Sequence, residues 1–425
     1  MNVPATNWAR NIRFGARRFH APDSVAELRR IIAASTSLRV LGTGHSFNAI
    51  ADTRGDLVSL ARLPREIELD ERAATVKVRA GLRFGELTEA LHRSGFALHN
   101  LGSLPHISVA GACATGTHGS GVGNRCLASA VRAIELVTAE GQLVTVGQDA
   151  PDFAGMAVSL GALGVITRIT LGLVPAFAVR QWVYEGLPVT ALRERCDEVM
   201  AAAYSVSLFT DWRTDRVNQV WVKRTTAEDA PERWLGATLA DGPRHPVPGV
   251  PPEQCTRQLG TPGPWYARLP HFRMDFTPSS GDELQSEYFV DRSDAVAAFD
   301  ALHTIRARIS PALQISEIRT VAADQLWLSP AYQRDAVAFH FTWHPDTVLA
   351  TDAVRAVEKA LSPFAARPHW GKVFTTDPET VRGLYPRHGD FRRLLARLDP
   401  AGKFSNEFVR RHFPIEQGAG PRLLD

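Results

Sequence analysis

The sequence predicts an α+β protein of two domains, with a large antiparallel sheet covered by helices in the second. The chain has 425 residues, whereas an ordinary domain has roughly 100 to 200, so more than one core is expected. Residues 1–175 alternate short β-rich runs with helical patterns and glycine turns. From about Arg180 the strands become longer and helices follow them, which is typical of a sheet with one covered face.

The helices and strands of the first part are predicted from hydrophobic periodicity and from the positions of glycine residues. Leu87 and Leu91 share one face of an amphipathic helix that stops at Gly95. An earlier strand runs directly into the polar glycine turn at 42–46, so a ligand could be met at that strand end. We predict helices at 25–34 and 84–94, and strands at 38–41, 74–78, 130–137 and 165–173.

The second part of the sequence differs from the first in its longer predicted strands and in a proline-rich segment. A proline-rich segment at 225–270 is expected to be irregular, either as a surface loop or as a lid over a site. Near the C-terminus, residues 391–413 are helical with a turn at 399–402. We predict strands at 205–212, 219–223, 315–321 and 337–343, and helices at 296–310 and 350–360.

Composition excludes several classes of function. A net charge of +3 spread over this length gives no basic stripe, so neither nucleic acid nor an anionic membrane is an expected partner. No run of about 18 apolar residues is present, so no membrane span is predicted. The four cysteines lack C-x-x-C spacing, and no apolar stretch follows Arg17 and Arg18 as an export signal would require. We therefore expect a cytoplasmic protein that acts through a pocket.

Two glycine-rich stretches are candidates for binding a large cofactor. Gly42-Thr43-Gly44-His45-Ser46 frees backbone N–H groups for an anion, but it fits neither the P-loop nor the Rossmann fingerprint. The stretch from Ser103 to Gly121 lacks bulky side chains and could press against a flat cofactor. A tight crossing of two backbones remains the alternative for this second stretch.

The histidines do not predict a metal site. The neighbourhoods of His45, His106 and His118 lack the nearby carboxylates or cysteines that would complete one. His340 and His344 alternate with aromatic residues as in a strand, which excludes the helical zinc geometry.

A second polar constellation comes from strand alternation. Glu317 and Arg319 should share one face of their strand, and His340 and Thr342 one face of theirs. If the two strands are neighbours, these groups line one surface; a solvated ion pair between Glu317 and Arg319 is the alternative. Lys372 lies in a segment otherwise built for burial, although the chain has only five lysines.

These stretches together resemble the alditol oxidases, a branch of the vanillyl-alcohol oxidase superfamily of FAD-dependent flavoenzymes. The resemblance extends from Thr6-Asn-Trp-Ala to Asp399-Pro-Ala-Gly-Lys-Phe. Its motifs are G-T-G-H-S-F at 42–47, S-L-P-H-I-S-V-A-G from Ser103, G-T-H-G-S-G at 116–121, S-L-G-A-L-G-V-I-T from Ser159, E-I-R-T-V-A-A-D from Glu317, H-F-T-W from His340 and H-W-G-K-V-F from His369.

The resemblance implies a fold, a cofactor and a set of site residues. The fold would be the two-domain FAD-binding type (PCMH type), with an FAD-binding domain at 1–176, a substrate or cap domain at 177–380, and a C-terminal segment at 381–425 that returns to the first domain. FAD would be attached covalently to His45. The other cofactor contacts would be Gly42, Thr43, Gly44, Ser46, Ser103, Ser108, Gly111, Thr115, Gly116, Thr117, His118 and Ile166. The substrate contacts would be Ser103, Glu317, Arg319, Thr342 and Lys372.

The implied activity is oxidation of a terminal hydroxyl of a small polyol, such as xylitol, sorbitol or glycerol, with reduction of O₂ to hydrogen peroxide. Lys372, His340 and Arg319 would be catalytic, and hydride would pass to flavin N5. Gly102 stands where related enzymes often carry alanine, so the missing methyl group predicts a wider path for oxygen. We expect a monomer. An aldonolactone oxidoreductase of the same superfamily and a non-catalytic nucleotide-binding module are the alternatives.

Overall fold

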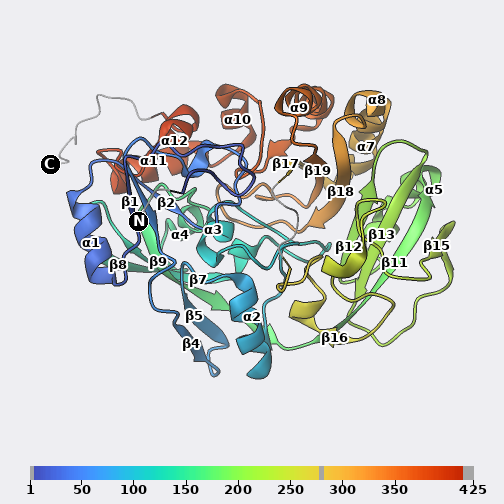
Figure 1. Ribbon diagram of the computed structural model, residues 1–425, viewed down its shortest axis with the longest axis horizontal. Helices are drawn as coiled ribbons and strands as arrows, with labels where there is room; N and C mark the ends of the chain where they lie inside the picture. Colours follow the sequence, from blue (N-terminus) through green and yellow to red (C-terminus); the bar gives the residue numbers. More distant parts are fainter. Residues whose placement is uncertain (1–3, 277–281, 415–425) are drawn as a thin grey trace.

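The protein forms two lobes that lie side by side in the computed structural model (Figure 1). The structure describes residues 4–276 and 282–414. Each lobe has its own apolar core. Among these residues no helix combines the length and apolar character needed to cross a membrane.

The first lobe is built on two sheets. A parallel sheet has the order β1-β3-β2, and an antiparallel sheet has the order β4-β5-β9-β7-β8. The strands are β1 (Arg18–His20), β2 (Leu38–Leu41), β3 (Asp56–Ser59), β4 (Ile67–Asp70), β5 (Thr75–Arg79), β7 (Val131–Val137), β8 (Leu143–Gly147) and β9 (Val165–Gly172), with a small pair of β6 (Phe96–Ala97) and β10 (Val174–Pro175). The helices are α1 (Val25–Ala34), α2 (Phe84–Arg93), α3 (Val109–Ala114) and α4 (Phe153–Met156).

Local sequence explains the main elements of this lobe. Burial alternates strictly along β9, as expected for a strand with one face in the core. In α2, Leu87 and Leu91 are fully buried, and the backbone N–H of Arg83 donates to the carboxylate of Glu86 at 2.9 Å. Gly95 then adopts a φ of +81°, a left-handed conformation that glycine adopts without strain and that ends the helix. The helices and strands predicted at 25–34, 38–41 and 84–94 are therefore present.

The second lobe is a ten-stranded sheet whose paired strands are all antiparallel. Its order is β14-β15-β11-β13-β12-β18-β19-β17-β20, with β16 paired to β11. The strands are β11 (Ala178–Pro188), β12 (Ser205–Thr210), β13 (Arg216–Arg224), β14 (Arg233–Trp234), β15 (Ala237–Leu239), β16 (Gly263–Pro264), β17 (Leu284–Asp291), β18 (Leu313–Val321), β19 (Ala336–Trp343) and β20 (Arg367–Pro368).

Helices cover one face of this sheet and leave the other face toward the first lobe (Figure 1). Phe339 and Phe341 of β19 pack with Val354 and Leu302 of the helices in one apolar core. The helices are α5 (Val189–Glu194), α6 (Cys196–Met200), α7 (Ala295–Thr304), α8 (Arg306–Ile309) and α9 (Thr347–Leu361). The α+β class with a large antiparallel sheet is confirmed.

The C-terminal helices return to the first lobe. They are α10 (Pro378–Leu384), α11 (His388–Leu398) and α12 (Glu407–His412). Phe391, Leu394 and Val409 from these helices are buried in the same core as Leu87 and Leu91. Trp327, between β18 and β19, and Trp370, after β20, also pack in that core, so the two lobes are tied together by apolar contacts.

Two expectations were wrong in detail. The predicted helix at 296–310 is broken at Ile305 into α7 and α8, although Leu302 and Ile309 on either side stay buried. The proline-rich segment is not wholly irregular: it contributes the short strands β14, β15 and β16 and two 3₁₀ turns, Pro252–Gln254 and Trp265–Ala267. Proline is tolerated at the ends of such short elements because it then removes no ladder hydrogen bond.

Candidate active site

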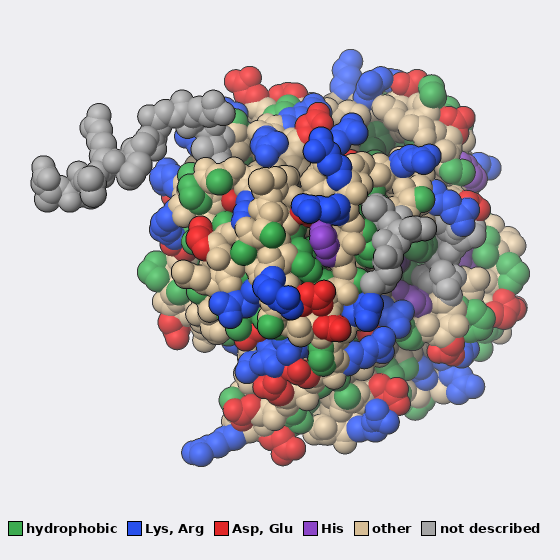
Figure 2. All heavy atoms as spheres, turned by 60° about the vertical axis from the view of Figure 1, so that its left-hand side comes forward, with side chains coloured by type: hydrophobic (Ala, Val, Ile, Leu, Met, Phe, Trp, Pro, Cys, Tyr) green, Lys and Arg blue, Asp and Glu red, His purple; other side chains and the backbone are tan. Residues whose placement is uncertain are grey.

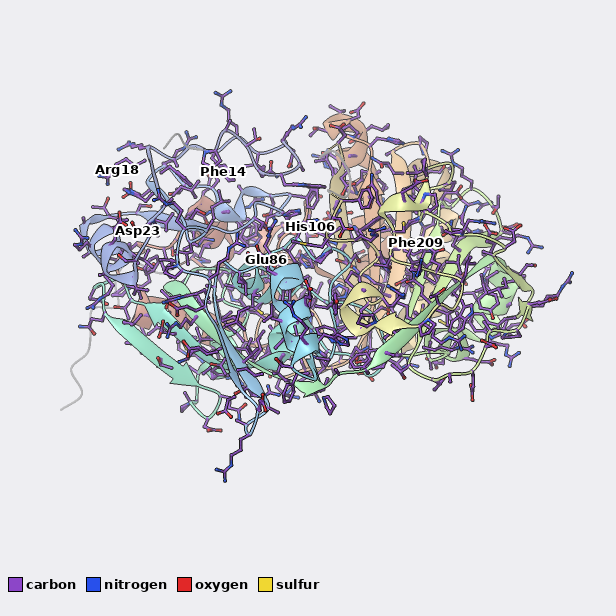
Figure 3. All side chains as sticks on the ribbon, turned by 60° about the horizontal axis from the view of Figure 1, so that its bottom comes forward. Phe14, Arg18, Asp23, Glu86, His106 and Phe209 are labelled. Atoms are coloured by element: carbon purple, nitrogen blue, oxygen red, sulfur yellow. The ribbon has the colours of Figure 1, made fainter. Side chains whose placement is uncertain are left out.

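The two lobes enclose a cavity of about 1030 Å³. Glu86 in the first turn of α2 and Phe209 on β12 line it from opposite lobes (Figure 3). Ligand pockets usually measure about 300 to 1,000 Å³, so this cavity can hold a large ligand. Most residues expected at the site line it: Gly42, Thr43, Gly44, His45, Ser46, Gly102, Ser103, Ser108, Gly111, Thr115, Thr117, His118, Ile166, Glu317, Arg319, His340, Thr342 and Lys372.

One wall of the cavity is a cradle of backbone that depends on glycine. A methyl group on Gly42 would lie 2.5 Å from Ser108 Oγ, and one on Gly111 would lie 2.8 Å from the same atom. Gly44 has a φ of +74°, which strains any other residue. The turn after β2 and the start of α3 are thus packed against each other, and their backbones form a surface without bulky side chains.

Gly116 is the exception among the expected cofactor contacts, because it does not line the cavity. Its φ is +70°, and a methyl group there would lie 3.1 Å from Pro330 Cδ. Chain conformation and packing against Pro330 therefore account for glycine at this position.

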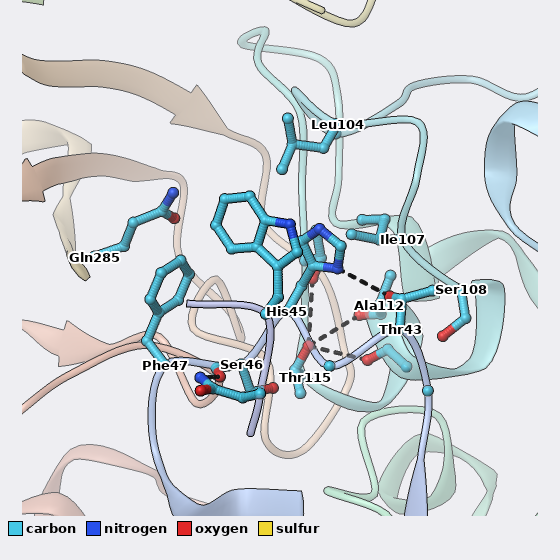
Figure 4. Close-up of a pocket in the computed structure, with 18 of the residues that line it drawn as sticks. Thr43, His45, Ser46, Phe47, Leu104, Ile107, Ser108, Ala112, Thr115 and Gln285 are labelled. Carbon is cyan, nitrogen blue, oxygen red and sulfur yellow. Dashed lines mark hydrogen bonds between the residues drawn. The ribbon is translucent and has the colours of Figure 1, made fainter. Parts of the chain in front are cut away.

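His45 is held between an indole ring and a hydroxyl group. The ring centroids of Trp8 and His45 lie 4.8 Å apart at an interplanar angle of 20°, and His45 Nδ1 lies 3.1 Å from Thr43 Oγ1 (Figure 4). Burial, and secondarily the nearby His106, lowers the pKa of His45 to about 4. The imidazole is therefore neutral at pH 7 and has a lone pair available for bond formation.

The turn that carries His45 is clamped by the N-terminal segment of the chain. Asn7 Nδ2 donates to Ser46 O at 2.8 Å, and Asn11 Nδ2 donates to Phe47 O at 2.8 Å. The backbone N–H of Trp8 donates to Gly44 O at 2.9 Å. Residues 7–11 therefore fix the position of the turn at 44–47. The sequence contained the Thr6-Asn-Trp-Ala motif but gave no indication of this contact.

The opposite wall is the open face of the β18–β19 pair. The register sets Glu317 opposite His340, so the grouping expected from strand alternation is present. Arg319 and Thr342 also line the cavity, whereas Phe339 and Phe341 point into the core beneath the helices. In Figure 4, Gln285 of the neighbouring strand β17 lies on the opposite side of His45 from Ser108.

Glu287 on β17 is the centre of the charge network, and our sequence reasoning missed it. Its carboxylate accepts a hydrogen bond from Lys372 Nζ at 2.7 Å and another from Arg319 NH2 at 2.7 Å. His118 Nε2 lies 3.2 Å from the same carboxylate. The side chain is only 1% exposed. A carboxylate directly before the apolar residues Tyr288 to Val290 was the available signal, since such a group is rarely buried without partners.

The network keeps both acids ionised in spite of burial. Burial alone would raise the pKa of Glu287, but Lys372, His118 and Arg319 hold it well below its usual value. Burial likewise opposes ionisation of Glu317, whose pKa is kept well below normal by Arg319 and by a hydrogen bond from His271. Burial lowers the pKa of Lys372, and Glu287 partly restores it.

His340 lines the cavity and has one ring nitrogen without a hydrogen-bond partner among the described residues. Its Nδ1 lies 3.7 Å from Glu317 Oε2, while Nε2 is buried and pairs with no atom of the described residues. Burial, with Lys372 as the second cause, lowers the pKa of His340 to about 4. A neutral imidazole with one open nitrogen can exchange a proton with a bound hydroxyl group.

Ser103 and Gly102 lie where the two walls meet. Arg319 NH1 donates to Ser103 Oγ at 3.3 Å, which links the strand face to the glycine-rich wall. A methyl group on Gly102 would lie 3.5 Å from Thr117 Cγ2, an ordinary van der Waals contact. Alanine would thus fit at this position without displacing its neighbours.

The residues present fit FAD. The glycine cradle offers close backbone approach for a flat group and its phosphates, and the neutral His45 lines the same cavity. Within residues 4–276 and 282–414, no three His, Cys, Asp or Glu side chains are grouped so as to hold a metal ion. Positive and negative side chains are interspersed on the face in Figure 2, so that face carries no stripe of one sign.

Comparison with known families gives two matches along the chain. Residues 16–147 match the model of the FAD binding domain, and residues 282–412 match that of D-arabinono-1,4-lactone oxidase. Among curated proteins, alditol oxidase of a Streptomyces species is 51% identical over 96% of this chain and 99% of its own length. L-gulono-1,4-lactone dehydrogenase of Mycobacterium tuberculosis is 29% identical over 92% of this chain and 94% of its own.

Solved structures share the fold at low identity. A solvent-stable cholesterol oxidase has a TM-score of 0.77 at 15% identity and covers 96% of both chains. A chitooligosaccharide oxidase has a TM-score of 0.74 at 12% identity, covering 95% of this chain and 93% of that one. At such identities the similarity establishes the arrangement of the lobes alone.

Proposed function

Because this chain belongs to the alditol oxidase family of FAD-dependent enzymes, we propose that its cavity binds FAD along the glycine cradle and a polyol against the β18–β19 face. The enzyme oxidises the terminal primary hydroxyl of a small polyol such as xylitol or sorbitol to the aldose and reduces O₂ to hydrogen peroxide. The observation that carries the site assignment is a buried network of two carboxylates and two cations opposite His45, in one continuous cavity.

The strand face suits a ligand made of hydroxyl groups. Glu317 accepts a hydrogen bond from a hydroxyl, Arg319 donates to one, and Thr342 can do either. Because these groups are already buried and ordered, little further entropy is lost when they bind. We assign Ser103, Glu317, Arg319, Thr342 and Lys372 to polyol binding.

Oxidation of an alcohol removes a hydride and a proton, and each needs an acceptor. When bound, FAD supplies the hydride acceptor and is reoxidised by O₂. Lys372 Nζ donates to the reacting hydroxyl oxygen and polarises it, while His340 Nε2 takes the proton. Arg319 and Lys372 place two positive charges beside the cavity, which stabilises negative charge that develops during hydride transfer.

Anaerobic reduction of the holoenzyme by xylitol tests this assignment. Glu317→Gln should raise KM for xylitol, and Lys372→Met should slow the colour loss of the enzyme-bound cofactor. The control is His92→Ala, which changes a partly buried histidine of the first lobe that lies in edge contact with Tyr266. If Glu317→Gln binds and oxidises xylitol as the wild type does, the strand face is not the polyol site.

We also propose that FAD is joined covalently to His45. The stacked Trp8 ring, the bond to Thr43 and the neutral imidazole support this assignment. Acid precipitation of the holoenzyme should leave a yellow pellet, and His45→Ala should release all of its flavin into the supernatant. His344→Ala, which changes an exposed histidine that lines the same cavity directly after β19, is the matched control and should keep the colour in the pellet. A colourless wild-type pellet would refute the covalent bond.

An aldonolactone substrate is the competing assignment, favoured by the match of residues 282–412 to the lactone oxidase model. The much higher identity to an alditol oxidase argues against it. Turnover of an aldonolactone with an artificial electron acceptor, compared with xylitol and O₂, separates the two. A non-catalytic nucleotide-binding module would have no need of the buried network at Glu287.

The remaining assignments concern the state of the protein. We propose a cytoplasmic monomer with an FAD-binding domain at 1–176, a cap at 177–380 and a returning segment at 381–425. The unpaired cysteines and the core shared by the first lobe and α10–α12 support this view. Light scattering of the holoenzyme and fractionation of cells provide the tests.

A further inference from the structure

Lys223 is a buried cation on the same face of the sheet as Glu317 and Arg319, but it does not line the cavity. Its side chain on β13 is only 1% exposed. The ammonium group has three acceptors: Leu269 O at 2.5 Å, Pro270 O at 3.2 Å and His271 Nδ1 at 3.2 Å. Three acceptors match the three N–H donors of a charged lysine, so the group is fully satisfied in its protonated form.

His271 connects this lysine to Glu317. Its Nε2 lies 2.7 Å from Glu317 Oε1, and its backbone N–H donates to Ser103 O at 3.1 Å. Because the ammonium group of Lys223 can only donate a hydrogen bond, Nδ1 of His271 must accept it. The proton of the neutral imidazole is then on Nε2. The ring therefore donates to Glu317, and the contacts form one directed chain from Lys223 through His271 to the carboxylate.

The consequence for Glu317 is a fixed orientation. Oε1 is occupied by His271, with Arg319 Nε at 3.5 Å, whereas Oε2 faces His340 and the cavity. If the ring proton moved to Nδ1, a nitrogen lone pair would face the carboxylate and repel it. The orientation of Glu317 thus depends on the tautomer of His271, and the tautomer depends on Lys223.

Charged groups on the neighbouring elements shift the pKa values of Lys223 and His271. Burial lowers the pKa of Lys223 to about 7, with Arg319 acting in the same direction and Glu317 and Cys255 opposing. Burial and Lys223 lower the pKa of His271 to about 4. Beyond Glu317 lie His340, Lys372 and Glu287, and Ser207 Oγ lies 3.5 Å from His271 Nε2. Between about pH 4 and pH 7, the histidine is therefore neutral while the lysine is charged.

We propose that Lys223 and His271 are positioning residues, which hold Glu317 with one oxygen directed at the polyol by fixing the imidazole tautomer. This inference rests on the proposed role of Glu317 in polyol binding. Lys223 does not line the cavity, whereas His271 lines it beside Glu317. The contribution of both residues to polyol binding is made through Glu317.

A double-mutant cycle on the holoenzyme tests the proposal, since a residue that acts only through another loses its effect when that other is replaced. Lys223→Met should raise KM for xylitol about tenfold and change kcat little. His271→Gln keeps an N–H donor for Glu317 but has no tautomer, so it should stay within about threefold of the wild type. In the His271→Gln background, Lys223→Met should then change KM by less than about twofold.

Thr256→Val is the matched control for disturbance of the loop at 269–272. Thr256 Oγ1 donates to Pro270 O at 2.7 Å, so this change removes a bond to one of the carbonyls that Lys223 binds without touching the His271 ring. It should leave KM near the wild-type value. Nitrogen NMR of the imidazole rings gives a direct readout: the His271 signals should report a proton on Nε2 in the wild type and a mixture in Lys223→Met.

The outcomes separate this proposal from the one on which it rests. If Glu317→Gln leaves KM unchanged, the polyol site itself is misassigned. If Glu317→Gln raises KM but Lys223→Met raises it equally with histidine or glutamine at position 271, the lysine acts through general stability and the tautomer argument is overturned. An unchanged KM in Lys223→Met overturns it as well.

Discussion

Replacing Glu287 by glutamine should destabilise the protein and change the pH dependence of its reaction. The carboxylate is 1% exposed and compensates two buried cations, Lys372 and Arg319, each bonded to it at 2.7 Å. Removal of one member of such a buried network typically costs about 3 to 5 kcal/mol, because the remaining charges stay buried without a partner. For a chain of this length, that corresponds to a fall of about 3 to 5 °C in the unfolding midpoint.

The same change should act on Lys372. Glu287 raises the pKa of this lysine against the effect of burial, so its loss should lower that pKa further. In the pH profile of the rate of cofactor reduction by xylitol, the loss of rate at alkaline pH should then begin at lower pH. Thermal unfolding of the holoenzyme and anaerobic stopped-flow at several pH values measure the two effects.

The control is Glu68→Gln, which removes an exposed carboxylate paired with Lys77 at 3.2 Å. An exposed pair contributes well under about 1 kcal/mol, so the midpoint should hardly change. Glu287→Gln and the wild type could instead have equal unfolding midpoints and the same pH profile of cofactor reduction. The charge of Glu287 would then be needed neither for stability nor for the pKa of Lys372.

Three further predictions follow from positions near the cavity. Gly102→Ala adds a methyl group 3.5 Å from Thr117 Cγ2, so it should fit without strain, slow reoxidation by O₂ and leave reduction by xylitol unchanged within about twofold; equal reoxidation rates would contradict the role of this glycine. Lys372→Met should lower the rate of cofactor reduction by about 100-fold or more and spare FAD retention, as measured by absorbance after gel filtration; unchanged reduction would refute its catalytic role. The folded pKa of Lys223, about 7, lies below its unfolded value, so the unfolded chain binds more protons above pH 7 and the lysine opposes folding most at low pH. Denaturant titrations should therefore show the stability of the wild type rising relative to Lys223→Met by up to about 1.4 kcal/mol per pH unit between pH 7.5 and 10; parallel curves would contradict this.

The sequence predicted which residues share a face of a strand, but not which strands lie next to each other in the sheet. Alternation set Glu317 with Arg319 and His340 with Thr342, because side chains point to opposite faces with a period of two. It could not show that β18 and β19 are paired, since pairing depends on contacts distant in sequence. Glu287 was missed for the same reason: its partners lie 32 and 85 positions away.

Local periodicity also misjudged where elements end. The apolar pattern runs through Ile305 because both halves of the broken helix bury one face, so the pattern alone could not reveal the break. Gly116 was included among the cofactor contacts through the family resemblance; it does not line the cavity, and its neighbour in space is Pro330. A run of glycines predicts close packing but not what packs against it.

The contacts of Asn7, Trp8 and Asn11 with the turn at 44–47 have a practical consequence for anyone who makes this enzyme. A fusion partner or an immobilisation linker placed directly before these residues should disturb the hydrogen bonds that hold the turn of His45. Such attachments therefore belong away from this end of the polypeptide, or behind a spacer long enough to leave residues 4–12 undisturbed.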